Sequence, residues 1–157
     1  MKEIFNVVEQ VVQDIKDIKI QWATNIAKAA FEVLISESKE KEFGDKWEYL
    51  DFIYKSMDIL IAARPTEPML FNGMDYIRAE MKKIEEKDVK KVQEKVIESA
   101  QFYLNLINET AERAVLNGLG IINEWYNVLT HCHSSSAIKT LKLHKIKGIN
   151  FKVYNTE

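Results

Sequence analysis

Few residues in this chain break regular backbone structure, and that scarcity constrains the fold more than any other feature. Only five glycines and two prolines occur in 157 residues, so long stretches run without interruption. Up to Gly118, apolar residues recur three and four positions apart, which is typical of helices that bury one face. With 46% apolar residues, a chain of this length can also bury a core. We therefore expect a mainly α-helical fold as far as Gly118.

Five helices are expected before Gly118. The apolar spacing and the breakers place them over about residues 4–18, 20–38, 45–62, 68–77 and 88–116. Trp47 is expected on the apolar face of the third helix. Thr66 is the expected N-cap of the fourth helix, and Pro68 fits its first turn.

The pattern changes after Gly118 and Gly120. A short apolar run predicts a strand at 126–130, followed by a polar loop at 131–136, a helix at about 137–144 and a second strand at 149–154. Strand, helix and strand in this order form a βαβ unit, and parallel sheets of this kind bind ligands at the carboxyl ends of their strands. Because two strands alone make an unstable sheet, we expect them to pack on the chain's own helices, to pair with another subunit or to belong to a longer chain.

Charge and hydropathy exclude several classes of function. The 22 basic and 24 acidic residues give a formal net charge of −2, so the basic excess typical of nucleic-acid-binding proteins is missing. No apolar segment approaches the roughly 20 residues that cross a bilayer, and residues 1–19 mix charges into the apolar positions, unlike a signal peptide. The single cysteine excludes an intramolecular disulfide. We expect a soluble cytoplasmic protein with no nucleic-acid or membrane partner.

The residues from Val128 to Ser136 are the strongest candidates for chemistry. Cys132 is expected at the carboxyl end of a strand and close to a helix N-terminus, where free N–H groups and the helix dipole stabilise a thiolate. Ser134, Ser135 and Ser136 could hold a phosphate together with those N–H groups. A buried and inert cysteine is the alternative, because free cysteine is common in protein cores.

Three histidines invite a metal-site interpretation, which their spacing does not favour. His131 and His133 flank the cysteine, and His144 is the third imidazole of the chain. A structural zinc site needs four convergent ligands, and neighbouring residues at a strand end point to opposite sides. We expect neither a metal nor another cofactor.

Two further stretches could contribute to a binding site. Arg64 precedes Pro65, and an arginine on a rigid turn beside a helix N-cap can grip a phosphate or carboxylate with two hydrogen bonds. A connector that carries a surface charge is the other interpretation. Gln21, Trp22 and Ala23 stand near a helix start, and residue chemistry alone assigns them no function.

Together these stretches resemble the archaeal branch of the translation initiation factor 2B alpha, beta and delta family, which includes ribose-1,5-bisphosphate isomerase and methylthioribose-1-phosphate isomerase. The resemblance rests on ARPTEPMLFNGMDYI at residues 63–77 and VLTHCHSS at 128–135, with support from ATNIA at 23–27 and FKVYNTE at 151–157. It implies a helical N-terminal domain, here residues 1–120, and the incomplete start of a Rossmann-like α/β domain, here 121–157. It also implies a homo-oligomer in the full-length form.

The resemblance implies roles for individual residues. Cys132 matches the catalytic acid or base of the isomerases, and Arg64 matches an arginine that holds the substrate. Ser134 and Ser135 match a loop near the substrate phosphate. The implied reaction opens the ring of a ribose 1-phosphate and moves a proton between C1 and C2, which converts an aldose to a ketose in AMP salvage, and a thiol acid or base suits that proton transfer.

The chain departs from the family pattern in two places. Gln21 and Ala23 match the substrate-binding loop near the N-terminus, which normally has a glycine between them so that backbone can approach the ligand. Trp22 occupies that place here, and its indole should either block the pocket or turn away from it. The family's second catalytic residue, an aspartate in the later part of the Rossmann-like domain, has no counterpart in residues 1–157.

Two hypotheses follow. The first is a truncated ribose-1,5-bisphosphate isomerase-like protein, inactive as this fragment, which Cys132 and Arg64 favour. The second is a non-catalytic, regulatory initiation factor 2B-like module that binds a sugar phosphate or nucleotide, or pairs with partner subunits through its helices, which Trp22 favours.

Overall fold

The computed structural model describes residues 6–132 and 134–156 of the chain. Within them lie six helices and two strands, and the chain divides into two compact units, Met1–Asn105 and Leu106–Glu157. The division falls inside the fifth helix, which therefore contributes residues to both units. The domain boundary expected at residue 120 stays a prediction.

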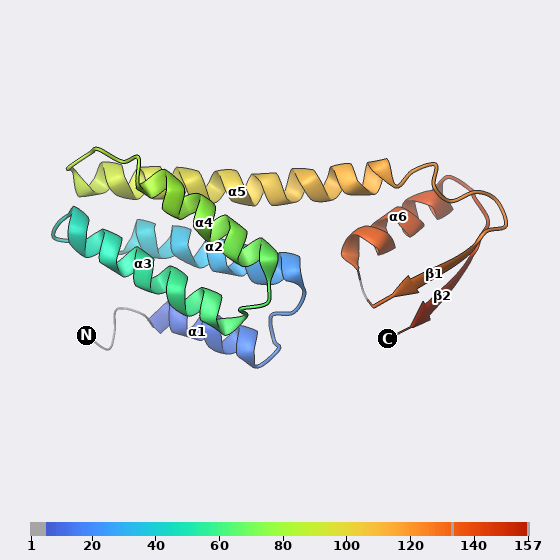
Figure 1. Ribbon diagram of the computed structural model, residues 1–157, viewed down its shortest axis with the longest axis horizontal. Coiled ribbons are helices and arrows are strands. Elements are labelled where there is room, and N and C mark those ends of the chain that lie inside the picture. Colours follow the sequence, from blue (N-terminus) through green and yellow to red (C-terminus); the bar gives the residue numbers. More distant parts are fainter. Residues whose placement is uncertain (1–5, 133, 157) are drawn as a thin grey trace. The chain divides into compact units, whose positions relative to one another are not determined.

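Four helices and the first part of a fifth build the first unit (Figure 1). Their bounds are α1 Asn6–Lys16, α2 Ala23–Glu40, α3 Lys46–Ala63, α4 Pro68–Met81 and α5 Val89–Asn117. The predicted helical architecture is confirmed, although residues 4 and 5 of the predicted first helix lie outside the described residues. α1 packs against α2 and α3, and α2 packs against α4. The core between these helices includes the buried side chains of Phe31, Leu34, Ile53, Leu60, Leu70, Met74, Ile77, Val92 and Val96.

Asp45 starts α3 as its N-cap. Its carboxylate accepts hydrogen bonds from the N–H groups of Trp47 and Glu48 at 2.7 and 2.9 Å, which satisfies two donors of the first turn. The expectation that Trp47 lies on the apolar face is wrong, since its side chain is 73% exposed. Trp47 belongs to the first turn, ahead of Tyr49, the first buried residue of this helix.

Glu67, not Thr66, is the N-cap of α4. Its Oε1 accepts a hydrogen bond from the N–H of Met69 at 3.3 Å, and Pro68 occupies the first turn as expected. Proline at the first helical position fixes the cap at the residue directly before it, so the hydroxyl of Thr66 lies one position too early.

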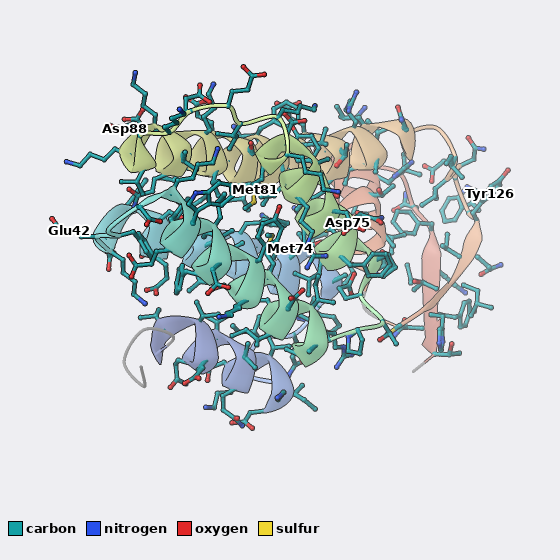
Figure 2. All side chains as sticks on the ribbon, turned by 60° about the vertical axis from the view of Figure 1, so that its left-hand side comes forward. Glu42, Met74, Asp75, Met81, Asp88 and Tyr126 are labelled. Atoms are coloured by element: carbon teal, nitrogen blue, oxygen red, sulfur yellow. The ribbon has the colours of Figure 1, made fainter. Side chains whose placement is uncertain are left out.

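Gly73 allows α4 to lie close to two other helices. An added Cβ would overlap Cζ of Phe31 in α2 and lie 2.5 Å from Cε1 of Tyr103 in α5. The next residue, Met74, is fully buried, whereas Asp75 is exposed (Figure 2). The backbone of α4 therefore packs against aromatic rings at the one point where it carries no side chain.

The second unit contains the predicted βαβ arrangement, which is confirmed. β1 Asn127–His131 and β2 Lys152–Thr156 are parallel neighbours, and α6 Ser135–Ile146 connects them. The register places Leu129 beside Tyr154 and His131 beside Thr156. Both strands therefore end at the same edge of the sheet.

The second strand begins at Lys152 rather than at the expected Ile149. Asn150 is engaged before the strand, because its N–H donates to Oε2 of Glu124 and its carbonyl accepts from the N–H of Trp125, both at 2.6 Å. These two bonds hold the loop before β1 against the loop before β2, so ladder pairing starts only after them.

Large apolar side chains of the second unit are exposed. Ile121, Trp125, Leu129 and Ile146 are between 68% and 81% exposed, and Tyr154, beside Leu129 in the register, is 55% exposed. Parallel sheets are usually covered on both faces, so this sheet leaves an apolar face open. Among the described residues, no helix combines the length and apolar character that a bilayer span requires.

Candidate functional site

Cys132 directly follows β1 and is exposed. The alternative of a buried cysteine is therefore wrong. Its φ of 59° places the backbone in the left-handed region, which residues with a side chain rarely adopt. Sparsely populated conformations of this kind concentrate at functional sites, where neighbouring contacts enforce them.

The N-terminus of α6 lies two residues beyond Cys132. Ser134 is the N-cap, and its Oγ accepts a hydrogen bond from the N–H of Ala137 at 3.3 Å. Ser135 is the first residue of the helix, and both serine side chains are exposed. The free N–H groups of a first helical turn attract anions, so this turn has the chemistry that a phosphate site needs. The thiol thus lies where a strand ends and a helix begins, while the roles of Cys132 and the serines stay predictions.

Thr156 is a residue at this sheet edge that sequence reasoning missed. Its carbonyl accepts a hydrogen bond from the N–H of Cys132 at 2.9 Å, and its hydroxyl shares a hydrogen bond of 2.9 Å with Nδ1 of His131. The rule that parallel strands end at one edge could have indicated it, but only with the register known.

The histidines are dispersed. His131 is bound to Thr156, whereas His144 is fully buried in α6, with Nδ1 at 2.9 Å from the carbonyl of Thr140 and Nε2 lacking a partner among the described residues. His144 stands nine residues after Ser135, about 14 Å along the helix at 1.5 Å per residue. His133 lies outside the described residues. In the described ranges, 6–132 and 134–156, no three His, Cys, Asp or Glu side chains are grouped so that they could hold a metal ion.

Arg64 lies in the first unit, at the turn between α3 and α4. Its N–H donates to the carbonyl of Ile61 at 3.1 Å, and its own carbonyl accepts from the N–H of Glu67 at 3.1 Å. These two backbone bonds fix the turn. The side chain is exposed, and its guanidinium forms no hydrogen bond or ion pair with any residue that the structure describes. An unengaged guanidinium on a fixed turn can bind an anion.

Gln21 and Ala23 flank the start of α2. The side chain of Gln21 donates to the carbonyl of Ile18 at 2.8 Å, and Ala23 is the first helical residue. Between them Trp22 is the N-cap residue with φ 73° and ψ 135°, and its indole is 47% exposed. This backbone conformation suits glycine.

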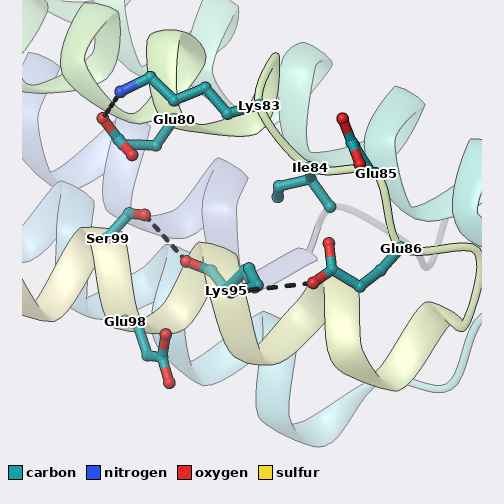
Figure 3. A pocket seen from close by; sticks show the side chains of 8 residues that line it. All are labelled: Glu80, Lys83, Ile84, Glu85, Glu86, Lys95, Glu98 and Ser99. Atoms are coloured by element: carbon teal, nitrogen blue, oxygen red, sulfur yellow. Dashed lines mark hydrogen bonds and ion pairs between the residues drawn. The ribbon is translucent and has the colours of Figure 1, made fainter.

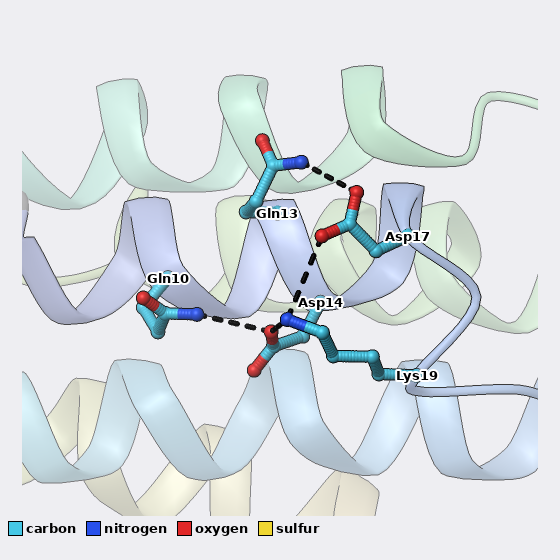
Figure 4. Close-up of polar contacts among 5 residues, drawn as sticks. All are labelled: Gln10, Gln13, Asp14, Asp17 and Lys19. Carbon is cyan, nitrogen blue, oxygen red and sulfur yellow. Dashed lines mark hydrogen bonds and ion pairs between the residues drawn. The ribbon is translucent and has the colours of Figure 1, made fainter.

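An ion pair restrains the turn that leads to Gln21 (Figure 4). Nζ of Lys19 lies 3.0 Å from Oδ1 of Asp14, which also accepts from Nε2 of Gln10 at 3.0 Å. The hydrogen bond from Lys19 holds the pKa of the Asp14 carboxyl below its usual range, and the same bond raises the pKa of Lys19. Because both groups face solvent, this pair is only a weak restraint.

The helical unit brings two of the predicted stretches to one end. Successive helices α1 to α4 alternate in direction, so the α1–α2 and α3–α4 connections both lie at the end where α1 and α3 finish (Figure 1). Gln21, Ala23 and Arg64 belong to these connections. Cys132, Ser134 and Ser135 belong to the other unit, and the expectation that they share a site with Arg64 stays a prediction.

Two cavities in the first unit lie away from these connections. One of about 300 Å³ is lined by Glu80, Lys83, Ile84, Glu85, Glu86, Lys95, Glu98 and Ser99 (Figure 3). Another of about 560 Å³ lies between the end of α2 and the start of α5. Neither is lined by a predicted site residue, and the four glutamates of the first make it unsuited to a phosphate.

Comparisons with known proteins support the resemblance. The model of the initiation factor 2 subunit family matches residues 19–157. Ribose 1,5-bisphosphate isomerase from Methanocaldococcus jannaschii is 31% identical over 158 aligned residues, which cover 97% of this chain and 47% of that protein. The chain therefore spans about half the length of the curated relatives it matches.

Solved structures share the fold. The 5-methylthioribose 1-phosphate isomerase from Pyrococcus horikoshii matches with a TM-score of 0.79 and 21% identity, over 94% of this chain and 51% of that one. The eIF2B delta subunit from Chaetomium thermophilum matches with a TM-score of 0.83 and 18% identity, over 96% of this chain and 58% of that one. At these identities the matches establish the helical unit followed by the start of an α/β domain, and no more.

Proposed function

The chain belongs to the initiation factor 2 subunit family, and from that premise we propose that it supplies the first half of a sugar-phosphate isomerase acting on ribose 1,5-bisphosphate. The exposed thiol of Cys132, between the end of β1 and the start of α6, is the observation that carries the proposal. Resemblance to the isomerases agrees with this placement. The proposed setting is AMP salvage in the cytoplasm, by a full-length homo-oligomer.

Cys132 is the proposed acid or base. The reaction opens the ribose ring, removes the proton from C2 and returns a proton to C1, so that an aldose becomes a ketose with no atom gained or lost. A thiol can take and return this proton. The proton transfer also needs a second acid or base, for which residues 1–157 offer no family counterpart. We therefore expect no turnover by residues 1–157 alone.

The proposed phosphate- and substrate-binding residues fall into two groups. Ser134 and Ser135, with the N–H groups of the first turn of α6, are the proposed partners of one phosphate. Arg64 is the proposed partner of the substrate from the helical unit, since its guanidinium is unengaged within the described chain. The backbone at Gln21 and Ala23 is also proposed to contact the substrate.

Ligand binding to the 157-residue chain tests this proposal. Ribose 1,5-bisphosphate should bind with a saturable heat in calorimetry, and Arg64→Gln should weaken binding roughly tenfold or more, because a hydrogen bond to a charged group is lost. Arg113→Gln is the matched control, since Arg113 is an exposed arginine of α5 outside the proposed site. Absence of saturable binding at millimolar ligand, or equal affinities of the two variants, would contradict the proposal.

The non-catalytic initiation factor 2B-like module is the second candidate. The indole of Trp22 favours it, because this large side chain is 47% exposed in the proposed substrate-binding loop. Under this alternative a sugar phosphate or nucleotide can bind, but the full-length form does not isomerise ribose 1,5-bisphosphate, with or without Trp22→Gly. If the isomerase proposal holds, the full-length form turns the substrate over, and Trp22→Gly keeps or raises that rate.

A further inference from the structure

The carboxyl ends of the two strands are joined by one residue, Thr156. Its carbonyl accepts from the N–H of Cys132 and its hydroxyl shares a hydrogen bond with Nδ1 of His131, each at 2.9 Å. His131 and Thr156 are also register partners, so both side chains stand on the same face of the sheet. One residue of β2 therefore contacts both the last residue of β1 and the residue after it.

Cys132 needs such a restraint. Its φ of 59° lies in the left-handed region, which costs a residue with a Cβ roughly 1–2 kcal/mol. A residue keeps a strained conformation only where surrounding contacts enforce it. For Cys132 those contacts are the two hydrogen bonds to Thr156, one on its own N–H and one on the preceding side chain.

We propose that Thr156 is a positioning residue for Cys132: the end of β2 holds the end of β1 in the left-handed turn that directs the thiol toward the N-terminus of α6. His131 takes part as the side chain through which the Thr156 hydroxyl acts. This inference rests on the proposed role of Cys132 as the reacting group. It adds to that role a physical reason why the thiol is oriented.

Alkylation of the chain by iodoacetamide tests the inference without any sugar phosphate. Cys132 is the single cysteine, so the reaction reports this thiol alone. The thiolate sulfur forms a bond to the carbon that carries iodine, iodide leaves, and the thiol proton passes to the buffer. At pH 7 the folded chain should react faster than the same chain in urea, because only in the folded chain does Thr156 fix the backbone at Cys132, two residues before the N-cap of α6.

Two pairs of variants isolate the hydrogen bond. Thr156→Val removes the hydroxyl and should lower the rate by about three- to tenfold, as expected for one hydrogen bond, whereas Thr156→Ser keeps the hydroxyl and the rate. His131→Phe should lower the rate as much as Thr156→Val, and combining the two should add nothing further. His131→Asn retains a polar group near the position of Nδ1 and should retain the rate. Asn155→Ala, on the neighbouring strand residue, is the control and should react like the unmodified chain.

Circular dichroism of each variant separates lost positioning from lost folding. If Thr156→Val does not fold, the two His131 variants carry the test. Equal rates for the folded Thr156→Val or His131→Phe variant and for Asn155→Ala would overturn the inference, as would a folded chain that reacts no faster than the chain in urea. Failure of ribose 1,5-bisphosphate to bind would instead count against the proposed function, because alkylation needs no ligand.

Discussion

Trp22, the N-cap of α2, has a backbone conformation that suits glycine. Its φ of 73° and ψ of 135° lie where a Cβ is strained. The family resemblance implies glycine at this position, so the backbone has the geometry that the family motif requires although the residue differs. The proposed substrate-binding loop therefore has the backbone conformation expected for glycine but carries an indole side chain.

This conformation predicts an unusual order of stabilities. Trp22→Gly should be more stable than Trp22→Ala by about 1–2 kcal/mol, because only glycine relieves the strain and because glycine is also the better N-cap. Urea unfolding followed by circular dichroism measures the difference. Glu32→Ala and Glu32→Gly are the control pair, because Glu32 is an exposed residue inside α2. There the alanine variant should be the more stable by about 1 kcal/mol. A Trp22→Ala variant as stable as Trp22→Gly would show that the left-handed conformation is absent in solution.

Cys132 shows what residue-level reasoning could and could not predict. Its position between a strand and a helix follows from the order of apolar run, polar loop and helix in the sequence. Its left-handed backbone conformation could not be predicted, because a glycine at this position would have indicated such a turn and a cysteine does not. Thr156 was missed for a related reason, since its importance depends on a strand register that no local pattern specifies.

Among the elements, α4 depends most on one residue. Gly73 should not tolerate alanine, because the new methyl group would overlap the ring of Phe31 and press on that of Tyr103. We expect Gly73→Ala to destabilise the chain by about 1–3 kcal/mol, the usual cost of overpacking, although alanine is the better helix former by about 1 kcal/mol. Asn72→Ala, at the exposed neighbouring position, should be neutral or slightly stabilising. Thermal or urea unfolding measures the difference in stability. A Gly73→Ala variant at least as stable as the unmodified chain would refute the close packing.

Elements before Gly118 were predictable because breakers are few and apolar spacing is regular. The fifth helix shows this most clearly, because apolar residues at three- and four-residue spacings are buried there: Val92, Val96, Ala100, Leu104 and Ile107. The predictions were wrong at the ends of elements, where contacts with other parts of the chain or the identity of a single residue determine the boundary. β2 starts later than predicted because Asn150 forms hydrogen bonds with the loop before β1. The N-cap of α4 is one residue later than predicted because Pro68 places the cap at the residue directly before it.

In the molecule as a whole, the predicted site residues form two groups, one in each compact unit. Arg64, Gln21 and Ala23 gather at one end of the helical unit, whereas Cys132 and the serines occupy the carboxyl edge of the βαβ unit. Sequence motifs predicted both groups. Neither periodicity nor spacing specifies where one group lies relative to the other, since both are local properties of the sequence.

Turnover by a completed enzyme tests the proposed catalytic role of Cys132. Residues 1–157 would be joined to the later half of the Methanocaldococcus jannaschii isomerase, of which this chain matches 47%. The chimera should convert ribose 1,5-bisphosphate to the ketose, and Cys132→Ser should lower kcat by about 100-fold or more with little change in KM, as for loss of a general acid or base. If the Cys132→Ser chimera turns over at the unmodified rate, Cys132 is not the catalytic acid or base.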